Sequence, residues 1–332
     1  MSTIKDVCRL AKVSKSTVSR VLNDHPRVAK ATKERVLEVI EAIGYKPNSS
    51  AQALASKRTN SIGMLVGTLA GPYFSSLVSS TEETVRKKGV HLIATSGQGT
   101  KDNELDAIQF LMSKQVDGLI IHAGALSEED LLEIVNKAPA SIILNQHISA
   151  IADHCIGLDD RLGGYLATKH IIEQGHSNIA CITGPKHQFA SQDRLRGYLQ
   201  ALEEFGIEYN SDFVIEGRFD LKENRKAPQQ LLTQHPQVTA VFCFSDHIAL
   251  GLYEEIRAQG LIVGEDISVV GFDNSLPSEH VTPKLTSVNF PTIKMGTLAA
   301  NKVLSLINGT DFPTPQLLTP DLVIRGSVKK LN

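Results

Sequence analysis

Short apolar runs separated by helix-length segments are the feature that most constrains the fold of this chain. From Ile62 onward, each run is largely apolar, and most are followed by a stretch long enough for a helix. Strands of a parallel sheet covered on both faces have this character, because neither side of the strand meets water. The runs are IGMLVGT, VHLIATS, VDGLIIHA, ASIILNQ, IACITG, TAVFCFS and ISVVGFD.

The plan repeats from near Asp160, so we expect an α/β body with two doubly wound parallel sheets. Ligands of such sheets bind beyond the C-terminal ends of the strands. Residues 61–332 are therefore predicted to form two lobes with a ligand cleft between them. We expect crossovers between the lobes near residues 160 and 290. The segment after Phe290 should return to supply a last strand within LLTPDLVIRG.

Charge is distributed unevenly along the chain. Residues 1–58 contain 12 Lys or Arg against 5 Asp or Glu, whereas the remainder contains 22 against 31. A basic head on an acidic body predicts that only the head meets a polyanion such as DNA.

The head has the pattern of three short helices. Thr3 and Asp6 have the spacing of a capping box, and Ser14 can cap a second helix from Lys15 to about Asn23. A third helix is expected from about Ala31 to Ile43. Such a unit is a helix-turn-helix, whose second helix enters the major groove of DNA. The apolar positions expected to face its core are Ile4, Val7, Leu10, Ala11, Val13, Val18, Val21, Leu22, Val36, Leu37, Ile40 and Ile43.

The exposed face of the second helix is small, basic and rich in hydroxyl groups. Its members are Lys15, Ser16, Thr17, Ser19, Arg20 and Asn23. Hydroxyl groups can pack against sugar and phosphate, while Lys15, Ser16 and Arg20 can read bases or neutralise phosphates. A solvated amphipathic helix without a ligand is the alternative interpretation.

A possible hinge follows in NSSAQALASKRTNS, residues 48–61. One or two helical turns are marginal alone in water, so this segment could fold only on DNA, with Leu54 wedged between base pairs in the minor groove. A flexible linker is the alternative.

Candidate ligand contacts lie at the ends of the predicted strands or in the loops and helices that follow. They are Tyr73, Phe74, His122, Asn145, Arg196, Phe219, Ser245 and Asp273. Were the ligand a sugar, it would require planar groups that pair with hydroxyls and an aromatic face for the ring. Arg196, Asp273 and Asn145 meet the first need, and Phe219 and Phe74 meet the second. The alternatives are a surface ion pair for Arg196, core packing for Tyr73-Phe74, and a satisfied histidine for His122.

Several classes of protein are disfavoured by the sequence. No apolar run approaches the length of a membrane span, and the N-terminus lacks the apolar core of a secretory signal, so we expect a cytoplasmic protein. The four scattered cysteines predict neither disulfides nor a metal site. We expect no enzyme and no cofactor, because no dinucleotide, P-loop, zinc-protease or hydrolase motif occurs.

TIKDVCRLAKVSKSTVSRVLN, followed by IGYKPNSSAQALAS, resembles the DNA-binding head and hinge of the lactose/galactose repressor family. The segments IIHAGALSEEDL, CIGLDDRLGGYLATKHIIEQGHSNI and DRLRGYLQALEEFGI resemble galactose-type repressors. The resemblance implies a DNA-binding domain at residues 1–46, a hinge at 47–60, and a periplasmic-binding-protein-like body at 61–332 that binds effector and dimerises.

The resemblance also implies that Arg196, Phe219 and Asp273 contact the effector. Two departures are visible: Lys15-Ser16 replaces an apolar pair usual in galactose repressors, and Ser245 replaces an Asn usual in sugar-binding relatives. The first puts the operator sequence in doubt, and the second removes one hydroxyl contact or leaves it to water.

The expected function is an allosteric repressor that binds a palindromic DNA operator as a homodimer and is released by a sugar, either galactose, another hexose or a glycoside. No heptad extension follows Gly326, so no helical tetramerisation tail is expected. Two alternatives stay open: a purine- or nucleoside-responsive repressor of the same family, and a sugar-binding transport component.

Overall fold

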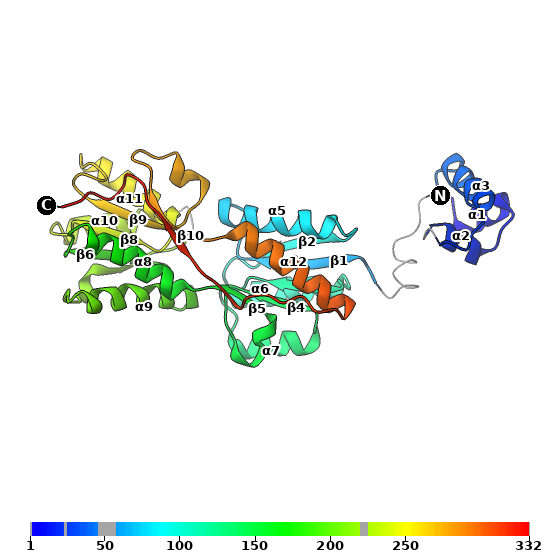
Figure 1. Cartoon of the computed structure of the whole chain (residues 1–332), viewed down its shortest axis with the longest axis horizontal. Helices are drawn as coiled ribbons and strands as arrows, with labels where there is room; N and C mark the ends of the chain where they lie inside the picture. The colour runs from blue at the N-terminus through cyan, green and yellow to red at the C-terminus, as the bar shows by residue number, and fades with distance from the viewer. Residues whose placement is uncertain (1, 23–24, 46–57, 220–224, 332) are drawn as a thin grey trace. The chain divides into compact units, whose positions relative to one another are not determined.

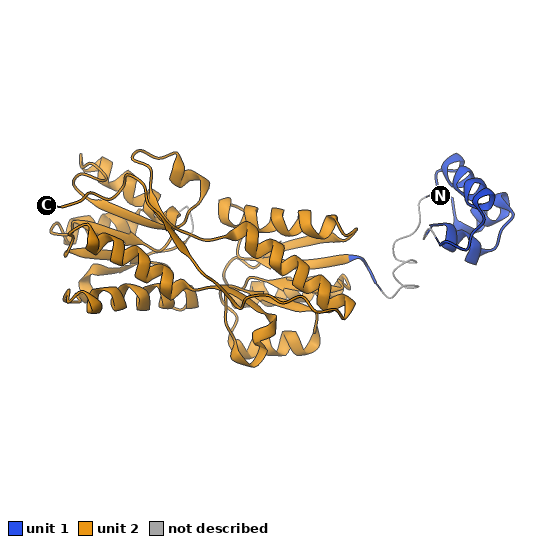
Figure 2. Cartoon of the chain, in the orientation of Figure 1, with its two compact units in different colours: residues 1–60 blue, residues 61–332 orange. Residues whose placement is uncertain are grey.

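The computed structural model describes residues 2–22, 25–45, 58–219 and 225–331 (Figure 1). It contains two compact units, residues 1–60 and 61–332 (Figure 2). Two expectations fall outside the described residues: Asn23 at the end of the second helix, and most of the hinge, including Leu54.

The described part of unit 1 consists of helices α1 (Ile4–Ala11), α2 (Lys15–Leu22) and α3 (Lys30–Ala42). Thr3 opens α1 with the expected capping box, since its backbone N–H and its hydroxyl donate to Asp6 Oδ2 over 3.0 and 2.8 Å. The backbone N–H of Thr17 donates to Ser14 Oγ over 3.2 Å, as expected of a cap at the start of α2. Two tight helix starts therefore follow directly from the sequence.

The small core of unit 1 is made by Val7, Ala11, Val18, Val21 and Val36. Two positions expected to face this core do not: Leu10 is 49% exposed and Leu37 is 43% exposed. On α1 the inward line runs through residues four apart, Val7 and Ala11. On α3, Val36 faces the core. Leu37 is the next residue, rotated about 100° around the helix axis, and therefore points away from the core.

Unit 2 contains two six-stranded sheets, with the orders β11-β5-β4-β3-β1-β2 and β12-β10-β9-β8-β6-β7. The first-lobe strands are β1 (Ser61–Val66), β2 (His91–Ser96), β3 (Gly118–Ile121), β4 (Ser141–Leu144), β5 (Cys155–Leu158) and β11 (Leu317–Leu318). The second-lobe strands are β6 (Ile179–Thr183), β7 (Val214–Glu216), β8 (Ala240–Cys243), β9 (Ser268–Asp273), β10 (Thr286–Asn289) and β12 (Asp321–Val323). All pairings are parallel except that of β12 with β10. The prediction of two parallel, doubly wound sheets is confirmed.

Helices cover both faces of each sheet (Figure 1). In the first lobe they are α5 (Pro72–Arg86) and α12 (Thr292–Asn308) on one face, with α6 (Lys101–Ser113) and α7 (Glu128–Lys137) on the other. In the second lobe they are α8 (Asp160–Glu173) and α9 (Phe189–Glu204), with α10 (Lys226–Gln234) and α11 (Asp246–Ala258) opposite. Three short 3₁₀ helices, η1 (Ser149–His154), η2 (Ser211–Phe213) and η3 (Leu276–Glu279), occur in connections of the described chain.

The continuous apolar runs are explained by this double coverage. Met64 packs into the core beside α5 and α12, whereas its neighbour Leu65 packs beside α6 and α7. Cys181 and Ile182 divide in the same way between the two faces of the second sheet. Successive side chains of a strand point to opposite faces, so both must be apolar when both faces are covered.

Three segments of the chain pass between the lobes. They lie between β5 and α8, between β10 and α12, and between β11 and β12. The single last strand expected in LLTPDLVIRG is wrong: the segment is divided into β11 in the first sheet and β12 in the second. Thr319 and Pro320 separate the two, and proline has no N–H for a ladder hydrogen bond.

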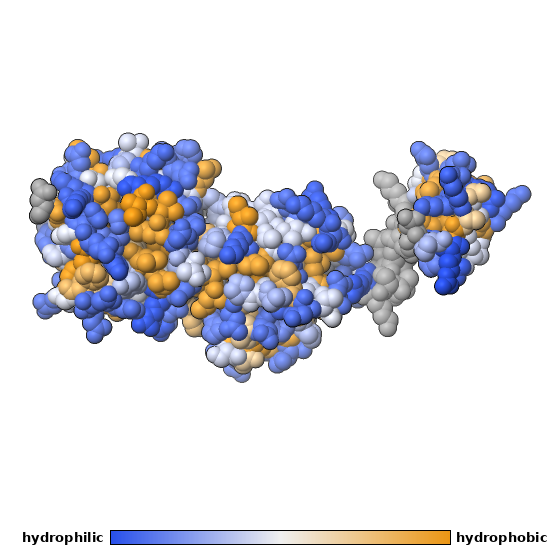
Figure 3. Space-filling view, viewed as in Figure 1, coloured by the Kyte–Doolittle hydropathy of each residue, from blue (hydrophilic) through white to orange (hydrophobic). Residues whose placement is uncertain are grey.

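The surface of unit 2 is mixed in character. On the face shown in Figure 3, apolar side chains gather in patches within a mostly hydrophilic surface. Among the described helices, none is long and apolar enough to cross a membrane.

Candidate DNA-binding surface and effector cleft

The outward face of α2 carries the residues predicted to meet DNA. Lys15, Ser16, Ser19 and Arg20 are exposed and Thr17 is half-buried. Ser14 Oγ lies 2.8 Å from Ser16 Oγ and 2.9 Å from Thr17 Oγ1, which gathers three hydroxyl groups at the start of the helix. No ion pair occupies Lys15 or Arg20 within the described chain. The start of α2 therefore presents Lys15 and three hydroxyl groups, and its last turn presents Arg20, which together suit phosphate and base edges.

The C-terminal ends of the two sheets face each other across unit 2. Gly71, after β1, lies beside His247 at the start of α11, since a Cβ on the glycine would be 3.6 Å from the His247 ring. Gly124, after β3, lies beside the Gln188 amide that precedes α9, because a Cβ on this glycine would be 3.4 Å from Gln188 Nε2. Loops from both lobes therefore lie close together at the place where the sequence predicts a cleft.

An aromatic cluster lies on the first-lobe side of the predicted cleft. Tyr73 packs edge-on against Phe74 and Phe290, with ring centroids 4.9 and 5.0 Å apart. The Tyr73 hydroxyl lies 3.2 Å from His122 Nε2. Burial lowers the pKa of His122 to about 4, so the ring is neutral near pH 7. His122 Nδ1 is buried without a hydrogen-bond partner among the described residues.

Two amides follow β4 on the same side of the cleft. Asn145 has a left-handed backbone, φ 58°, which asparagine tolerates better than most residues. Gln146 Nε2 donates to the carbonyl of Ala123 over 2.9 Å. Asn145 Oδ1 and Gln146 Oε1 are both buried and have no partner in the described chain. Buried acceptors are normally satisfied, so these two, with His122, point to a ligand or bound water.

The structure corrects the expected arginine of the second lobe. Arg196 is a surface residue, 61% exposed at its side chain and paired with Asp193 over 2.5 Å. Arg194 instead is 4% exposed and reaches the sheet. Its Nε donates to Asp160 Oδ1 over 2.8 Å, and its Nη1 donates to the carbonyl of Phe244. Residues two apart on a helix point in nearly opposite directions, so only one of the pair can face the cleft.

Asp273 ends β9 beside Arg194. Its backbone has φ 109°, an uncommon conformation for a residue with a side chain. Burial raises the pKa of Asp273 well above its usual range, the nearby Arg194 opposes this, and Asp246 and Asp160 reinforce it. Asp273 also contributes to the raised pKa of Tyr73, after the larger effect of burial. The carboxylate therefore lies near the aromatic cluster of the other lobe.

Phe219 and Ser245 are the two remaining candidate ligand contacts, and the structure gives them different surroundings. The Phe219 ring rests on Gly184, where a Cβ would lie 2.1 Å from the ring, and its centroid is 5.9 Å from Arg194 Cζ. Phe219 is thus placed to offer an aromatic face. Ser245 is 3% exposed and caps α11 by accepting from the backbone N–H of Ile248 over 3.3 Å. Its hydroxyl is already used by the fold.

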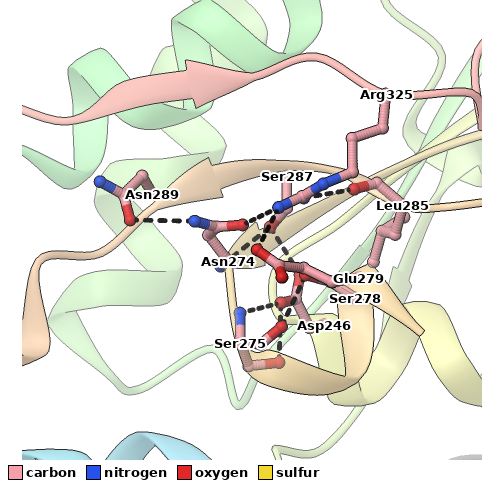
Figure 4. A network of polar contacts seen from close by, with 9 residues as sticks. All are labelled: Asp246, Asn274, Ser275, Ser278, Glu279, Leu285, Ser287, Asn289 and Arg325. Carbon is pink, nitrogen blue, oxygen red and sulfur yellow. Dashed lines mark hydrogen bonds and ion pairs between the residues drawn. The ribbon is translucent and has the colours of Figure 1, made fainter. Parts of the chain in front are cut away.

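Asp246, the first residue of α11, has a different role from the cap Ser245. Its fully buried carboxylate accepts from the N–H and hydroxyl of Ser275, at 2.6 and 2.9 Å, and from the Ser287 hydroxyl at 2.6 Å (Figure 4). Burial raises the pKa of Asp246 to about 6, although these hydrogen bonds and Arg325 oppose the shift.

Sequence reasoning missed Arg194, Asp160 and Gln146. A signal for Arg194 existed, because Gly197 and Tyr198 lie three and four residues further on and share its buried face. No comparable signal marked Asp160 or Gln146. No group of three or more His, Cys, Asp or Glu within the described ranges is placed to hold a metal ion.

Comparisons with known proteins agree with this architecture. Residues 3–48 match "Bacterial regulatory proteins, lacI family", and residues 168–328 match "Periplasmic binding protein-like domain". The chain is 36% identical to the HTH-type transcriptional regulator GalR of Escherichia coli (strain K12), over 99% of this chain and 96% of that protein. It is 37% identical to the HTH-type transcriptional repressor PurR of Vibrio vulnificus (strain CMCP6), over the full length of both.

Two solved structures are similar over nearly the whole chain. The Lac repressor dimer bound to operator and the anti-inducer ONPF has a TM-score of 0.87 at 28% identity, covering 99% of each chain. The complex of the transcriptional regulator CelR with cellobiose has a TM-score of 0.72 at 31% identity, covering 98% of this chain and 100% of that one.

Proposed function

This chain belongs to the lacI family of bacterial regulatory proteins, and from that premise we propose that it is a transcriptional repressor that binds an operator and is released from it by a small sugar. It acts by binding, not by catalysis.

The DNA-binding part of the proposal rests on α2. Its outward face presents Lys15, Ser16 and Arg20, while Val18 and Val21 hold the helix to the small core. In a helix-turn-helix the first residues of this helix reach base edges and the flanking helices position it on the backbone. Lys15 and Ser16 select the operator sequence, and Arg20 supplies affinity.

The second part of the proposal is that two copies act together on a palindromic operator. A single helix-turn-helix reads only a short half-site, and a two-fold dimer matches a palindrome. Apolar patches lie on the surface of unit 2 in Figure 3, and such patches can be buried against a second copy of the chain. The related Lac repressor was solved as a dimer on operator DNA.

The observation that carries the effector class is the juxtaposition of Arg194, Asp273 and Phe219 at one end of the second sheet. Planar charged groups bind vicinal hydroxyls in pairs, and an aromatic ring covers the apolar face of a sugar. Asn145 and His122 add polar atoms from the first lobe that have no hydrogen-bond partner among the described residues. Arg194 takes the place in this site that the sequence had suggested for Arg196.

A purine or nucleoside effector is the second candidate. The relatives include repressors named PurR, and the rings of Phe74 and Phe219 could stack on a flat base. The transport alternative is abandoned, because the head matches the DNA-binding domain of the lacI family.

Repression and release follow from linkage. Sugar that contacts both lobes favours one arrangement of the lobes, and this arrangement disfavours operator binding by the paired heads. Operator must then weaken sugar binding by the same factor. The hinge at residues 47–60 would transmit this change, and Leu54→Ala would test it by lowering operator affinity without altering sugar affinity.

Calorimetry with galactose, glucose, a β-glucoside, hypoxanthine and adenosine tests the effector. Operator preference is measured in parallel by selection from a palindromic DNA library. Saturable heat from a sugar, together with weaker operator binding in its presence, is expected. Heat from hypoxanthine alone, with operator affinity rising, would replace the sugar by a purine corepressor.

A further inference from the structure

Two hydrogen-bonded side-chain amides, those of Asn274 and Asn289, lie between the candidate effector residue Asp273 and the segments that join the lobes. Figure 4 shows this pair of amides. Asn274 directly follows Asp273, and its Nδ2 donates to Asn289 Oδ1 over 3.2 Å. Asn289 Nδ2 donates in turn to Asp321 Oδ1 over 2.9 Å. Asn289 is the last residue of β10 and Asp321 is the first of β12. These hydrogen bonds therefore end where two of the three crossovers begin or finish.

The backbone next to this pair of amides is held under strain. Asp273 and Asn274 both have positive φ, 109° and 50°. Strained conformations persist only where the surroundings determine them. Here the Asn274 N–H donates to Ser287 Oγ over 3.1 Å, and Asp246 accepts from the N–H of Ser275.

The Asn274 side chain has little freedom of its own. Arg325 Nη2 donates to Asn274 Oδ1 over 2.7 Å, while Asn274 Nδ2 is used by Asn289. Arg325 is fixed by a 2.7 Å bond to the Leu285 carbonyl and a 3.1 Å bond to Glu279. A displacement of Asp273 that moves Asn274 will therefore either move Asn289 as well or be opposed by the hydrogen bonds of Arg325.

We propose that Asn274 and Asn289 act as positioning residues that couple effector binding at Asp273 to the crossovers between the lobes. The proposal rests on the proposed function, because it requires an effector in the cleft. Hinge closure of two lobes is a two-state change that a ligand can bias. The backbone joins Asp273 to Asn274, and the hydrogen bonds from Asn274 to Asn289 and from Asn289 to Asp321 form a relay that continues to the segments that must move.

The outer end of the relay can be altered without endangering the fold. Asn289 is half-buried and Asp321 is exposed, so water can replace their hydrogen bond. The buried part of the network around Asp246 and Arg325 would remain in place.

The test uses the full chain and four variants: Asn289→Asp, Asp321→Asn, the double variant with both changes, and Asn301→Ala as control. In Asn289→Asp, the new carboxylate still accepts from Asn274 but repels Asp321. The double variant exchanges the two groups, so that position 321 donates to position 289 and net charge is unchanged. Asn301 is a half-buried amide whose Nδ2 donates to Thr297 O, 2.9 Å away within α12.

The readout is the ratio of operator Kd with and without saturating ligand, the ligand being the tightest binder among galactose, glucose, the β-glucoside, hypoxanthine and adenosine. Couplings of this kind are typically about 5- to 150-fold. Asn289→Asp should reduce the ratio at least about fivefold, while ligand Kd and ligand-free operator Kd change less than about threefold. The double variant should regain the ratio, and Asn301→Ala should keep it.

An unchanged ratio in Asn289→Asp, or no recovery in the double variant, overturns the relay. The relay is also overturned if Asn289→Asp weakens ligand binding and operator binding and lowers the thermal stability together, because a general loss of this kind indicates a structural role for Asn289. A wild-type protein whose operator affinity responds to none of the ligands instead contradicts the proposed function, and removes the basis of the relay with it.

Discussion

The guanidinium of Arg194 lies over the ring of Phe272, with 3.5 Å between Cζ and the ring centroid. Asp160 holds its Nε from one side, so the plane of the group is fixed against the end of the second sheet. A planar cation stacked in this way is pre-organised for paired hydrogen bonds in a manner that lysine cannot match.

Arg194→Lys should therefore weaken effector binding by roughly 10- to 100-fold, since hydrogen bonds to a charged group contribute about 1.5–3 kcal/mol. Lysine keeps the positive charge near Asp160 and avoids the cost of an unpaired buried carboxylate. Calorimetry with the bound sugar measures the loss. Arg196→Ala is the control and should change the affinity less than about twofold. The reverse ranking of the two variants would return the effector role to Arg196.

Asp273→Asn should produce a repressor that cannot be induced. Asparagine keeps the shape of the side chain and tolerates positive φ, so the fold and effector-free operator binding should remain near wild type. The altered hydrogen bond should weaken sugar binding by up to about 10-fold, since an ordinary hydrogen bond contributes about 0.5–1.5 kcal/mol. Anisotropy with labelled operator, repeated across sugar concentrations, measures both quantities. Sugar heat that is identical in wild type and variant would remove Asp273 from the site.

Arg20→Ala should nearly abolish specific operator binding, because a bidentate contact is worth about 1–3 kcal/mol in each half-site. Combined changes at Lys15 and Ser16 should alter which operator is preferred more than total DNA affinity. Arg9→Ala is a matched control on α1, where Arg9 is 74% exposed and pairs with Asp6. A library preference that stays the same in the Lys15/Ser16 variant would contradict the assignment of these two residues.

Local pattern and element type were predictable from the sequence because their physical causes are local. Thr3 and Asp6 lie three residues apart, and the same is true of Ser14 and Thr17, so their caps could be read directly. Continuous apolar runs likewise required sheets covered on both faces. The split of LLTPDLVIRG between two sheets was not predictable, because it depends on which strand edges are free elsewhere.

The candidate site was predictable only in part, for two separate reasons. Arg194 and Arg196 lie on the same helix but point in different directions. Which of them is buried is decided by the packing of Gly197 against the α8 backbone, where a Cβ would lie 2.0 Å from the Arg161 carbonyl. Asp246 gathers Ser275 and Ser287 from positions 29 and 41 residues away. Contacts of that separation follow from the folded sheet and leave no spacing in the sequence.

A pH-dependent part of the stability should arise at His176, which is 3% exposed in the second lobe. Its Nε2 lies 3.0 Å from the Lys329 carbonyl, which can only accept, so this nitrogen carries the proton of the neutral ring. Nδ1 then accepts from the Thr239 hydroxyl 2.9 Å away. Protonation would place a second proton against Thr239 and a charge in a buried position.

Burial lowers the pKa of His176 below its usual value of 6.5, and the bond to Lys329 only partly opposes this. The unfolded chain therefore binds a proton at a higher pH than the folded chain does. The stabilising contribution is complete above about pH 6.5 and falls as the pH drops toward the folded-state pKa. His122, His170 and His247 act in the same direction, whereas Asp246 and Asp273, with raised pKa values, act in the opposite one.

Comparing the pH dependence of the free energy of unfolding of the wild type with that of His176→Gln separates the contribution of His176 from those of the other groups. Urea unfolding between pH 5 and 8 should show the free energy of unfolding of the wild type falling more steeply on acidification than that of His176→Gln. The variant should be less stable at pH 8 by about 1–3 kcal/mol, because its hydrogen bonds to the C-terminal segment are altered in a buried place. His91→Gln, at an exposed position of β2, is the control and should follow the wild-type slope. Parallel curves for wild type and His176→Gln would show that His176 takes up a proton equally in both states.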